Sequence, residues 1–150
     1  MVDITDWAYI AGCIDGEGCL SFNISSKVTV QITIVNTDKK MIDFINRVCN
    51  KAEIKMGIHY RDPRKAMFKG RIITGVKKCW GIYPTSFRDK LSFLELVFPY
   101  LIIKQEKANL LIEELKHRLE KRNLSSTWNP WKLRIDKTDR SLYERWKQIG

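Results

Sequence analysis

The strict alternation of apolar and polar residues between Leu20 and Ile34 constrains the fold of this chain more than any other pattern. Apolar side chains occupy the even positions on both sides of the turn Ser25-Ser26-Lys27, namely Leu20, Phe22, Ile24, Val28, Val30, Ile32 and Ile34. Because side chains alternate between the two faces of a strand, this period of two predicts a two-stranded ribbon. One face of the ribbon is apolar and must be buried against other parts of the chain.

The opposite face of the ribbon carries mainly hydrogen-bonding side chains. Its members are Cys19, Ser21, Asn23, Ser25, Lys27, Thr29, Gln31 and Thr33. Such a row suits contacts to the edges of nucleic-acid bases. An exposed strand face rich in Thr and Ser also occurs without any ligand, so the row alone leaves both interpretations open.

The segment before the ribbon, Trp7 to Gly18 (WAYIAGCIDGEG), joins a helix to an acidic site. The helix has a face of small residues that lets another backbone approach closely, formed by Ala8, Ala11 and Gly12. We expect Gly16 and Gly18 to end the helix. Asp15 and Glu17 then lie at the negative end of the helix dipole, which costs up to about 1 kcal/mol. The junction therefore requires a compensating cation.

The rest of the chain predicts an α+β protein in which residues 1–150 form one domain. The first expected elements are a helix over about 38 to 50, capped by Thr37 or Asp38, and strands near Ile54 to Arg61 and Val76 to Tyr83. A helix from Ser86 to Pro99 follows, with Asp89 completing a capping box. The last expected elements are a long helix from about Lys104 to Arg122 and a closing helix with Leu142, Trp146 and Ile149. A turn is expected at Asp62-Pro63-Arg64-Lys65, followed by a poorly patterned stretch for which a hairpin arm is one interpretation, and a loop over residues 123–131. The order is αββαββα, followed by extra C-terminal helices.

The composition favours a polyanionic partner. The 150 residues include 27 Lys and Arg against 17 Asp and Glu, which gives a formal charge of +10. Nucleic acid is the leading partner, although ribosomal and membrane-surface proteins share such a charge. A hydrophobic content of 44% excludes a disordered chain.

No segment predicts a membrane span or a signal peptide. The longest apolar stretch, Leu94 to Ile103, is interrupted by Glu95 and Pro99. We therefore expect no membrane partner and an intracellular location, either a prokaryotic cytoplasm or an organelle.

The cysteines and histidines lack the spacing of a zinc site. Cys13, Cys19, Cys49 and Cys79 form no CxxC pair, and His59 and His117 are far apart in the sequence. We expect buried or half-buried thiols in a reducing compartment.

The nine residues Ile10 to Gly18 (IAGCIDGEG) resemble the signature of the LAGLIDADG homing endonucleases, and they occur once. The resemblance implies a saddle-shaped antiparallel sheet whose concave face lies on DNA. It also implies a homodimer through the Trp7 to Asp15 helix. Within each subunit, it implies that Glu17 binds the catalytic metal and that the carbonyl of Gly16 is a further ligand. Most members of the family carry Asp at the position of Glu17.

A second segment, Pro99 to Leu110 (PYLIIKQEKANL), is similar to the one that supplies the family's active-site lysine, which maps to Lys104. Asn36 and Lys40 correspond roughly to family positions that organise water at the active site, although Asn36 is also suited to capping a helix. The resemblance implies Mg²⁺ as the cofactor, with other divalent cations such as Mn²⁺ able to substitute.

The function expected from these features is that of an intron-encoded homing endonuclease. Such an enzyme hydrolyses phosphodiester bonds in a long pseudo-palindromic duplex. Candidate DNA contacts are Ser21, Asn23, Lys27, Thr29, Gln31, Thr33, Lys55, His59, Arg61, Lys69 and Arg71. The alternatives are an intron-RNA splicing maturase, with intron RNA as its partner, or a non-cleaving DNA-binding protein on the same scaffold. A basic structural protein of a ribonucleoprotein would explain the charge but not the acidic junction.

Overall fold

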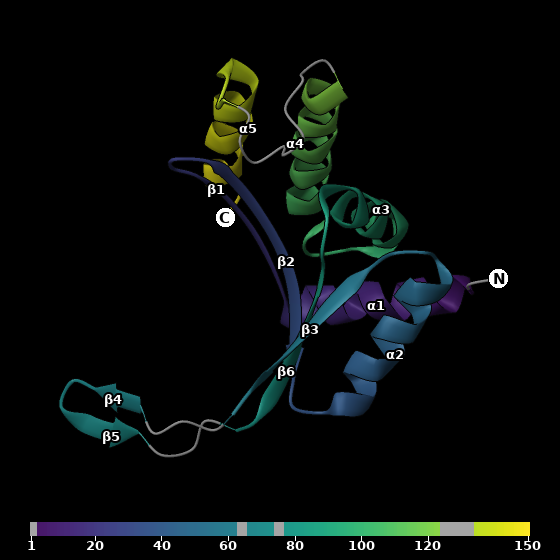
Figure 1. Cartoon of the computed structure of the whole chain (residues 1–150), viewed down its shortest axis with the longest axis vertical. Coiled ribbons are helices and arrows are strands. Elements are labelled where there is room, and N and C mark those ends of the chain that lie inside the picture. Colours follow the sequence, from purple (N-terminus) through teal and green to yellow (C-terminus); the bar gives the residue numbers. More distant parts are fainter. Residues whose placement is uncertain (1–2, 63–65, 74–76, 124–133) are drawn as a thin grey trace.

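The computed structural model describes residues 3–62, 66–73, 77–123 and 134–150, and its elements confirm the predicted α+β order (Figure 1). They are α1 (Ile4–Glu17), β1 (Gly18–Ile24), β2 (Val28–Asn36), α2 (Lys39–Lys51), β3 (Met56–Arg61), β4 (Ala66–Phe68), β5 (Arg71–Ile73), β6 (Cys79–Pro84), α3 (Phe87–Val97), the 3-10 helix η1 (Phe98–Tyr100), α4 (Gln105–Asn123) and α5 (Lys137–Gln148). The αββαββα core consists of α1 to α3 with β3 and β6 as its second strand pair. The helices α4 and α5 are the added C-terminal helices.

The sheet confirms the predicted ribbon and its two faces. Among the described residues, four antiparallel strands pair in the order β1-β2-β6-β3. Leu20 faces Ile32 and Ser21 faces Gln31, so the apolar and polar positions of β1 and β2 coincide across the ribbon. Figure 1 shows a curved sheet with the helices on its convex side and an open concave side. The apolar side chains at the even ribbon positions face the helices, which bury them.

Several helices share the task of covering the sheet. The helix α2 begins where predicted, with the Asp38 carboxylate accepting a hydrogen bond from the Lys40 N–H at 2.9 Å. The helix packs on β6 and β3 as well as on β2, so it covers only part of the apolar face of the ribbon. The apolar face of β1 is covered by α5, where Phe22 makes edge contacts with the rings of Tyr143 and Trp146. The predicted closing helix is therefore part of the core.

The end of α1 differs from the expectation. Gly16 stays within the helix, which ends at Glu17, and Gly18 begins β1 with an extended backbone. Gly18 is required for space, because a Cβ atom there would lie 2.7 Å from the Cα of Ile14. The expected face of small residues is also divided, since Ala11 is buried in the core while Ala8 and Gly12 are exposed. The exposed small positions on α1 are therefore Ala8, Gly12 and Gly16.

The second half of the chain follows the predicted elements with small shifts. The capping box of Ser86 and Asp89 is confirmed, but α3 ends at Val97 and η1 follows before Leu101. The poorly patterned stretch contains the hairpin β4–β5, which Figure 1 shows as an arm beyond the end of β3 and β6. In the predicted turn, residues 63–65 lie outside the described residues. In the predicted loop, residues 124–131 do so as well.

The cysteines are unpaired, as expected. Cys49 is buried, and desolvation raises the pKa of its thiol to about 12. Cys19 is exposed, contrary to the expectation of buried or half-buried thiols, because position 19 belongs to the open face of β1. Among the described residues, no helix combines the length and the apolar character that crossing a bilayer requires.

Candidate active site

Glu17 is held at the end of α1 by a residue from the end of β2. The Asn36 side-chain amide donates a hydrogen bond to Glu17 Oε2 at 2.5 Å. The Asn36 oxygen in turn accepts from the backbone N–H of Asp38 at 2.7 Å, just before α2 begins. Asn36 therefore links the start of α2 to Glu17, while the N-cap of α2 is Asp38. The carboxylate of Glu17 is exposed and fixed at one of its two oxygens.

Lys104 supplies the cation that the acidic junction requires. Its ammonium donates to the backbone oxygens of Ile14 at 2.6 Å, Asp15 at 3.1 Å and Gly18 at 2.6 Å. An ammonium has three N–H donors, so these three bonds use all of them. The positive charge lies at the negative end of the α1 dipole, where it is stabilising. The sequence indicated the need for a cation here, and the structure identifies Lys104.

Asp15 makes the complementary contact at the start of α4. Its carboxylate accepts hydrogen bonds from the backbone N–H groups of Ile102, Ile103 and Lys104 at 2.8, 3.2 and 2.9 Å. Burial opposes the ionisation of Asp15, but these N–H groups outweigh it and place the pKa of the carboxyl below its usual range. Sequence reasoning gave Asp15 no such role, because its partners lie 87 to 89 residues away in the chain.

The other predicted members of this site are less constrained. Gly16 is exposed, and its carbonyl is not among the oxygens that Lys104 contacts. Lys40 is exposed in the first turn of α2. Within the described part of the chain, no hydrogen bond joins the side chain of Lys40 to Glu17. The structure thus brings Glu17, Asn36 and Lys104 to one junction and leaves Lys40 on the adjoining helix.

Most of the predicted DNA contacts share the concave face of the sheet. The strand register and the alternation of side chains place a common set on this face: Ser21, Asn23, Thr29, Gln31 and Thr33 of the ribbon, and His59 and Arg61 of β3. Ser21 donates to Gln31 across the ribbon at 3.5 Å. Lys27 lies in the turn at the ribbon tip and Lys55 lies just before β3. Lys69 and Arg71 lie on the β4–β5 arm, beyond the four-stranded sheet.

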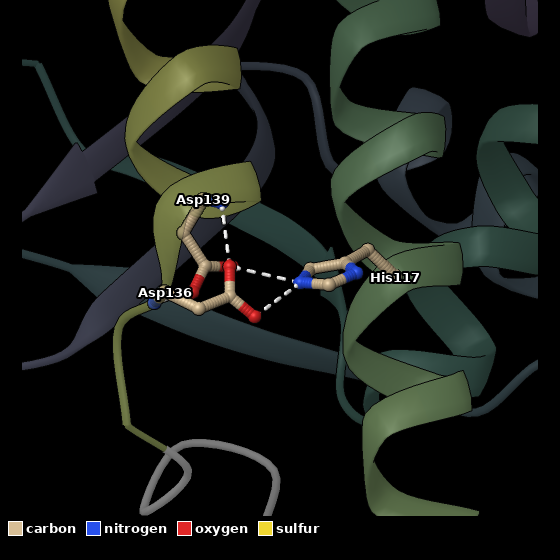
Figure 2. Close-up of side chains that lie close together, drawn as sticks. All are labelled: His117, Asp136 and Asp139. Carbon is tan, nitrogen blue, oxygen red and sulfur yellow. Dashed lines mark hydrogen bonds and ion pairs between the residues drawn. The ribbon is translucent and has the colours of Figure 1, made fainter.

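A separate group of polar residues joins α4 to α5. The ring of His117 lies 2.8 Å from Asp136 and 3.7 Å from Asp139, and single ligand atoms of the three lie within 4.8 Å of one another (Figure 2). Two cations already neutralise these carboxylates, since Lys121 is 3.1 Å from Asp136 and Arg118 is 2.8 Å from Asp139. Asp136 and Asp139 also form the capping box of α5. The group is thus explained as a helix cap and an ion-pair network.

Comparison with known proteins gives a result for structure and none for sequence. No family model matches the chain, and no curated protein matches it. Two similar crystal structures are of the homing endonuclease I-CvuI, one in complex with its target (Sro1.3) in the presence of 2 mM Ca, the other with the I-CreI target (C1221) in the presence of 2 mM Mg and with the DNA not cleaved.

Both structures match this chain over nearly its whole length. The TM-score is 0.56 and the sequence identity is 17% in each case. The first match covers 98% of this chain and 96% of that chain, and the second covers 99% and 100%. The chain therefore has the fold of the LAGLIDADG homing endonucleases, as the two sequence resemblances implied.

Proposed function

We propose that this protein is a LAGLIDADG homing endonuclease: a homodimeric, Mg²⁺-dependent enzyme that cuts both strands of a specific DNA duplex. One observation carries the proposal. The two segments that resemble the family meet through reciprocal hydrogen bonds between residues 86 to 90 positions apart, which join Asp15 to the segment just before α4 and Lys104 to the end of α1. If the two resemblances were due to chance, nothing would require the two segments to meet beside the same exposed carboxylate, that of Glu17.

The donor atoms at this junction suit a hard divalent cation. Glu17 is exposed, and one of its oxygens remains without a hydrogen bond from the described residues once Asn36 has bound the other. Carboxylate and carbonyl oxygens are the ligands that Mg²⁺ takes, and it retains several waters and contacts phosphate. We assign Glu17 and the Gly16 carbonyl as the residues that hold it, with Mn²⁺ as a substitute. When bound, the ion supplies an activated water and stabilises charge on the phosphate.

The surrounding residues act on this site in distinct ways. Asn36 holds the carboxylate of Glu17 in one orientation through its hydrogen bond to Oε2. Lys104 holds the backbone of the junction in place, because its three donors are bound to carbonyl oxygens. It also contributes a fixed positive charge near the site, which favours a phosphate and the negative charge that develops during hydrolysis. Lys40 would reach the same region from α2 to organise water.

A homodimer follows from the need for two such sites. Each chain carries one motif, and cutting both strands requires a second copy related by a two-fold axis. The exposed small residues Ala8, Gly12 and Gly16 leave the surface of α1 open to a second helix. Next to the end of α1, Ile102 and Ile103 are 85% and 76% exposed, which is unusual for isoleucines that remain in water. We infer that these surfaces pack against a second copy of the chain.

The concave face and the charge support double-stranded DNA as the substrate. A formal charge of +10 attracts the phosphate backbone without selecting a sequence. The polar row on β1 and β2 faces the open side of the sheet, where strands can enter a major groove and contact base edges. The I-CvuI structures with this fold contain target DNA, which supports the same substrate here. A dimer would contact two half-sites of a pseudo-palindromic duplex.

The test is selection of cleaved molecules from a library of randomised duplexes in the presence of Mg²⁺. We expect a long pseudo-palindromic site, cut on both strands. Glu17→Gln keeps the shape of the side chain and removes its charge, so it should abolish cleavage and leave duplex binding intact. Glu120→Gln, at an exposed position on α4, is the matched control and should cut normally. Cleavage by the Glu17 variant at the wild-type rate would show that the metal assignment is wrong.

A non-cleaving DNA-binding protein is the second candidate function. It is favoured by the engagement of all three Lys104 donors in backbone contacts, which leaves none for a water or phosphate. A second selection from the same library, for bound duplexes, separates the two candidates when it is compared with the selection for cleaved ones. A protein of the second kind would enrich a bound sequence and produce no cut duplex with Mg²⁺ or Mn²⁺.

A further inference from the structure

A pocket opens on the concave face where two strands of the sheet separate. The strands β2 and β6 pair from Ile34 with Ile82 to Asn36 with Trp80, and the earlier part of β2 pairs with β1 alone among the described strands. The end of β6 diverges from β2 beyond this point. The resulting pocket has a volume of about 330 Å³. Its lining includes Gln31 and Thr33 from β2 and His59 from β3, which are predicted DNA contacts.

One wall of the pocket consists of two aromatic rings that lie over glycines. His59 pairs with Gly81, and Tyr83 pairs with Gly57. A Cβ atom on Gly81 would lie 2.1 Å from the His59 ring, and one on Gly57 would lie 2.4 Å from the Tyr83 ring. Neither glycine has a positive φ, so both are needed for space. The glycines let the two rings, whose centroids are 5.9 Å apart, lie close to the sheet.

The remaining feature of the pocket is a half-buried lysine from the helix side of the sheet. Lys90 of α3 lines the pocket and donates to the backbone oxygen of Val30 at 2.8 Å, within the part of β2 that β6 does not reach. Burial lowers the pKa of Lys90, which means that its charge has lost part of its hydration. No carboxylate is among the described residues that line the pocket. The pocket therefore favours a group rich in hydrogen-bond acceptors.

We propose that this pocket binds the major-groove edge of one guanine in each half-site, with Tyr83 and Lys90 as specificity-determining residues. The inference rests on the proposed function and deepens it. Guanine presents two neighbouring acceptors, O6 and N7, in the major groove, whereas adenine presents one acceptor and one donor. A positively charged pocket with hydroxyl, amide and imidazole donors matches the guanine pattern. Neither Tyr83 nor Lys90 stands out in the sequence, because position 83 falls within a strand and position 90 within a helix.

The experiment compares base preferences at each position of the bound site. Randomised duplexes are selected by binding without divalent metal, using wild-type protein, Lys90→Met and Tyr83→Phe. Both variants should lose a preference for guanine at the same single position of each half-site, by roughly tenfold, while other positions keep theirs. Lys51→Met removes an exposed charge at the end of α2 that does not line the pocket, and it should leave all preferences unchanged.

The possible outcomes separate the pocket from the proposed function. If both variants retain every wild-type preference, the pocket does not contact a base. If Lys90→Met weakens the affinity for all sequences equally, and the salt dependence of binding falls by the equivalent of about one phosphate contact, then Lys90 contacts the DNA backbone and the proposal is overturned. Wild-type protein without any sequence preference would overturn the proposed function itself. Tyr83→Phe removes one hydroxyl and keeps the ring, so it decides the question if Lys90→Met does not fold.

Discussion

The ammonium of Lys104 binds the carbonyl oxygens at the end of the helix that carries Asp15, and the carboxylate of Asp15 binds the three backbone N–H groups just before the helix that follows Lys104. Each charge lies at the helix end whose dipole it complements. The exchange fixes α1 against α4, and Glu17 follows Asp15 by two residues at the same junction. The position of the proposed metal ligand therefore depends on a contact between two helices far apart in sequence.

Replacing Asp15 should weaken the fold at this junction. Asp15→Ala removes the acceptor of three backbone N–H groups, and we expect the free energy of unfolding to fall by about 1 to 2 kcal/mol. Urea denaturation measures this change. Asp43→Asn, which disrupts an exposed ion pair with Lys39, is the control and should change stability by less than about 0.5 kcal/mol. An equal effect of the two variants would contradict a stabilising role for these three hydrogen bonds.

The same carboxylate predicts a dependence of stability on acid. The folded pKa of Asp15 is lowered, so its contribution is fully present above the unfolded value of 3.8 and is lost as pH falls through the folded pKa. Asp15→Asn should therefore reduce the loss of stability below about pH 4. Urea titrations of wild type and variant at several acidic pH values measure this. Parallel curves for the two proteins would show that Asp15 does not contribute.

Lys104 should matter more for cleavage than for DNA binding. Lys104→Met keeps much of the side-chain length but leaves three carbonyl oxygens at the end of α1 without their cation. We expect cleavage to slow by at least tenfold while duplex affinity changes less than threefold. Lys104→Arg should not restore activity, because a planar guanidinium cannot direct its donors to these three oxygens in the same way. Full activity of the arginine variant would mean that charge alone suffices.

Asn36 should act through Glu17. Asn36→Ala removes the hydrogen bond to Glu17 Oε2, and we expect slower cleavage and a higher Mg²⁺ requirement with unchanged DNA binding. Raising the Mg²⁺ concentration should restore the cleavage rate of Asn36→Ala, because this variant loses only the orientation of the Glu17 carboxylate. Cleavage assays over a range of Mg²⁺ concentrations give both results. A cleavage rate that stays low at every Mg²⁺ concentration would indicate a role for Asn36 that is independent of Glu17.

The dimer can be tested by adding bulk to α1. We expect gel filtration to give about twice the chain mass of 17.6 kDa. Gly12→Leu should leave the single chain folded, because a Cβ atom at Gly12 meets nothing within 4 Å there. The added bulk should prevent the α1 helices of two copies from packing together, so the variant should be a monomer that makes no double-strand breaks. Asn109→Leu, at an exposed position on α4, should remain dimeric. A monomeric variant that still cuts both strands would refute the paired-site model.

The contact between α4 and α5 should depend on pH through Glu114. Burial, and then its hydrogen bond and charge interaction with Asp139, raise the pKa of Glu114 to about 8, despite the nearby Arg118. In the described part of the chain, Glu114 Oε2 and Asp139 Oδ1 are buried without a conventional hydrogen-bond partner, and a proton on Glu114 would let one donate to the other. The folded protein thus retains a proton that the unfolded chain releases above the ordinary value of 4.5.

This difference lowers the stability as pH rises from about 4.5 to about 8, by on the order of 1 kcal/mol per pH unit at most. Glu114→Gln carries no titrating proton and should flatten this slope, while stability near pH 5 changes little. Urea denaturation between pH 5 and 8 tests this. Glu113→Gln, at a partly exposed ion pair with Arg145, is the control and should keep the slope.

Local patterns in the sequence predicted most elements of the fold. The period of two from Leu20 to Ile34 identified the ribbon and its buried face, and the Ser86 and Asp89 capping box identified the start of α3. These predictions succeed because period and capping depend on residues a few positions apart. The motif around Glu17 and the segment around Lys104 were also visible in the sequence, although their roles in cleavage remain predictions.

The tertiary structure decided which groups meet. The sequence indicated that the α1 terminus needs a cation, but the choice of Lys104, and of Asp15 as its counterpart, depends on how α1 and α4 pack. Packing also buried Ala11, left Gly16 exposed, and enclosed Glu114. A sequence determines periodicity because neighbouring residues share one backbone geometry. The partners of a charge 89 residues away depend on the packing of the whole core, which no local pattern contains.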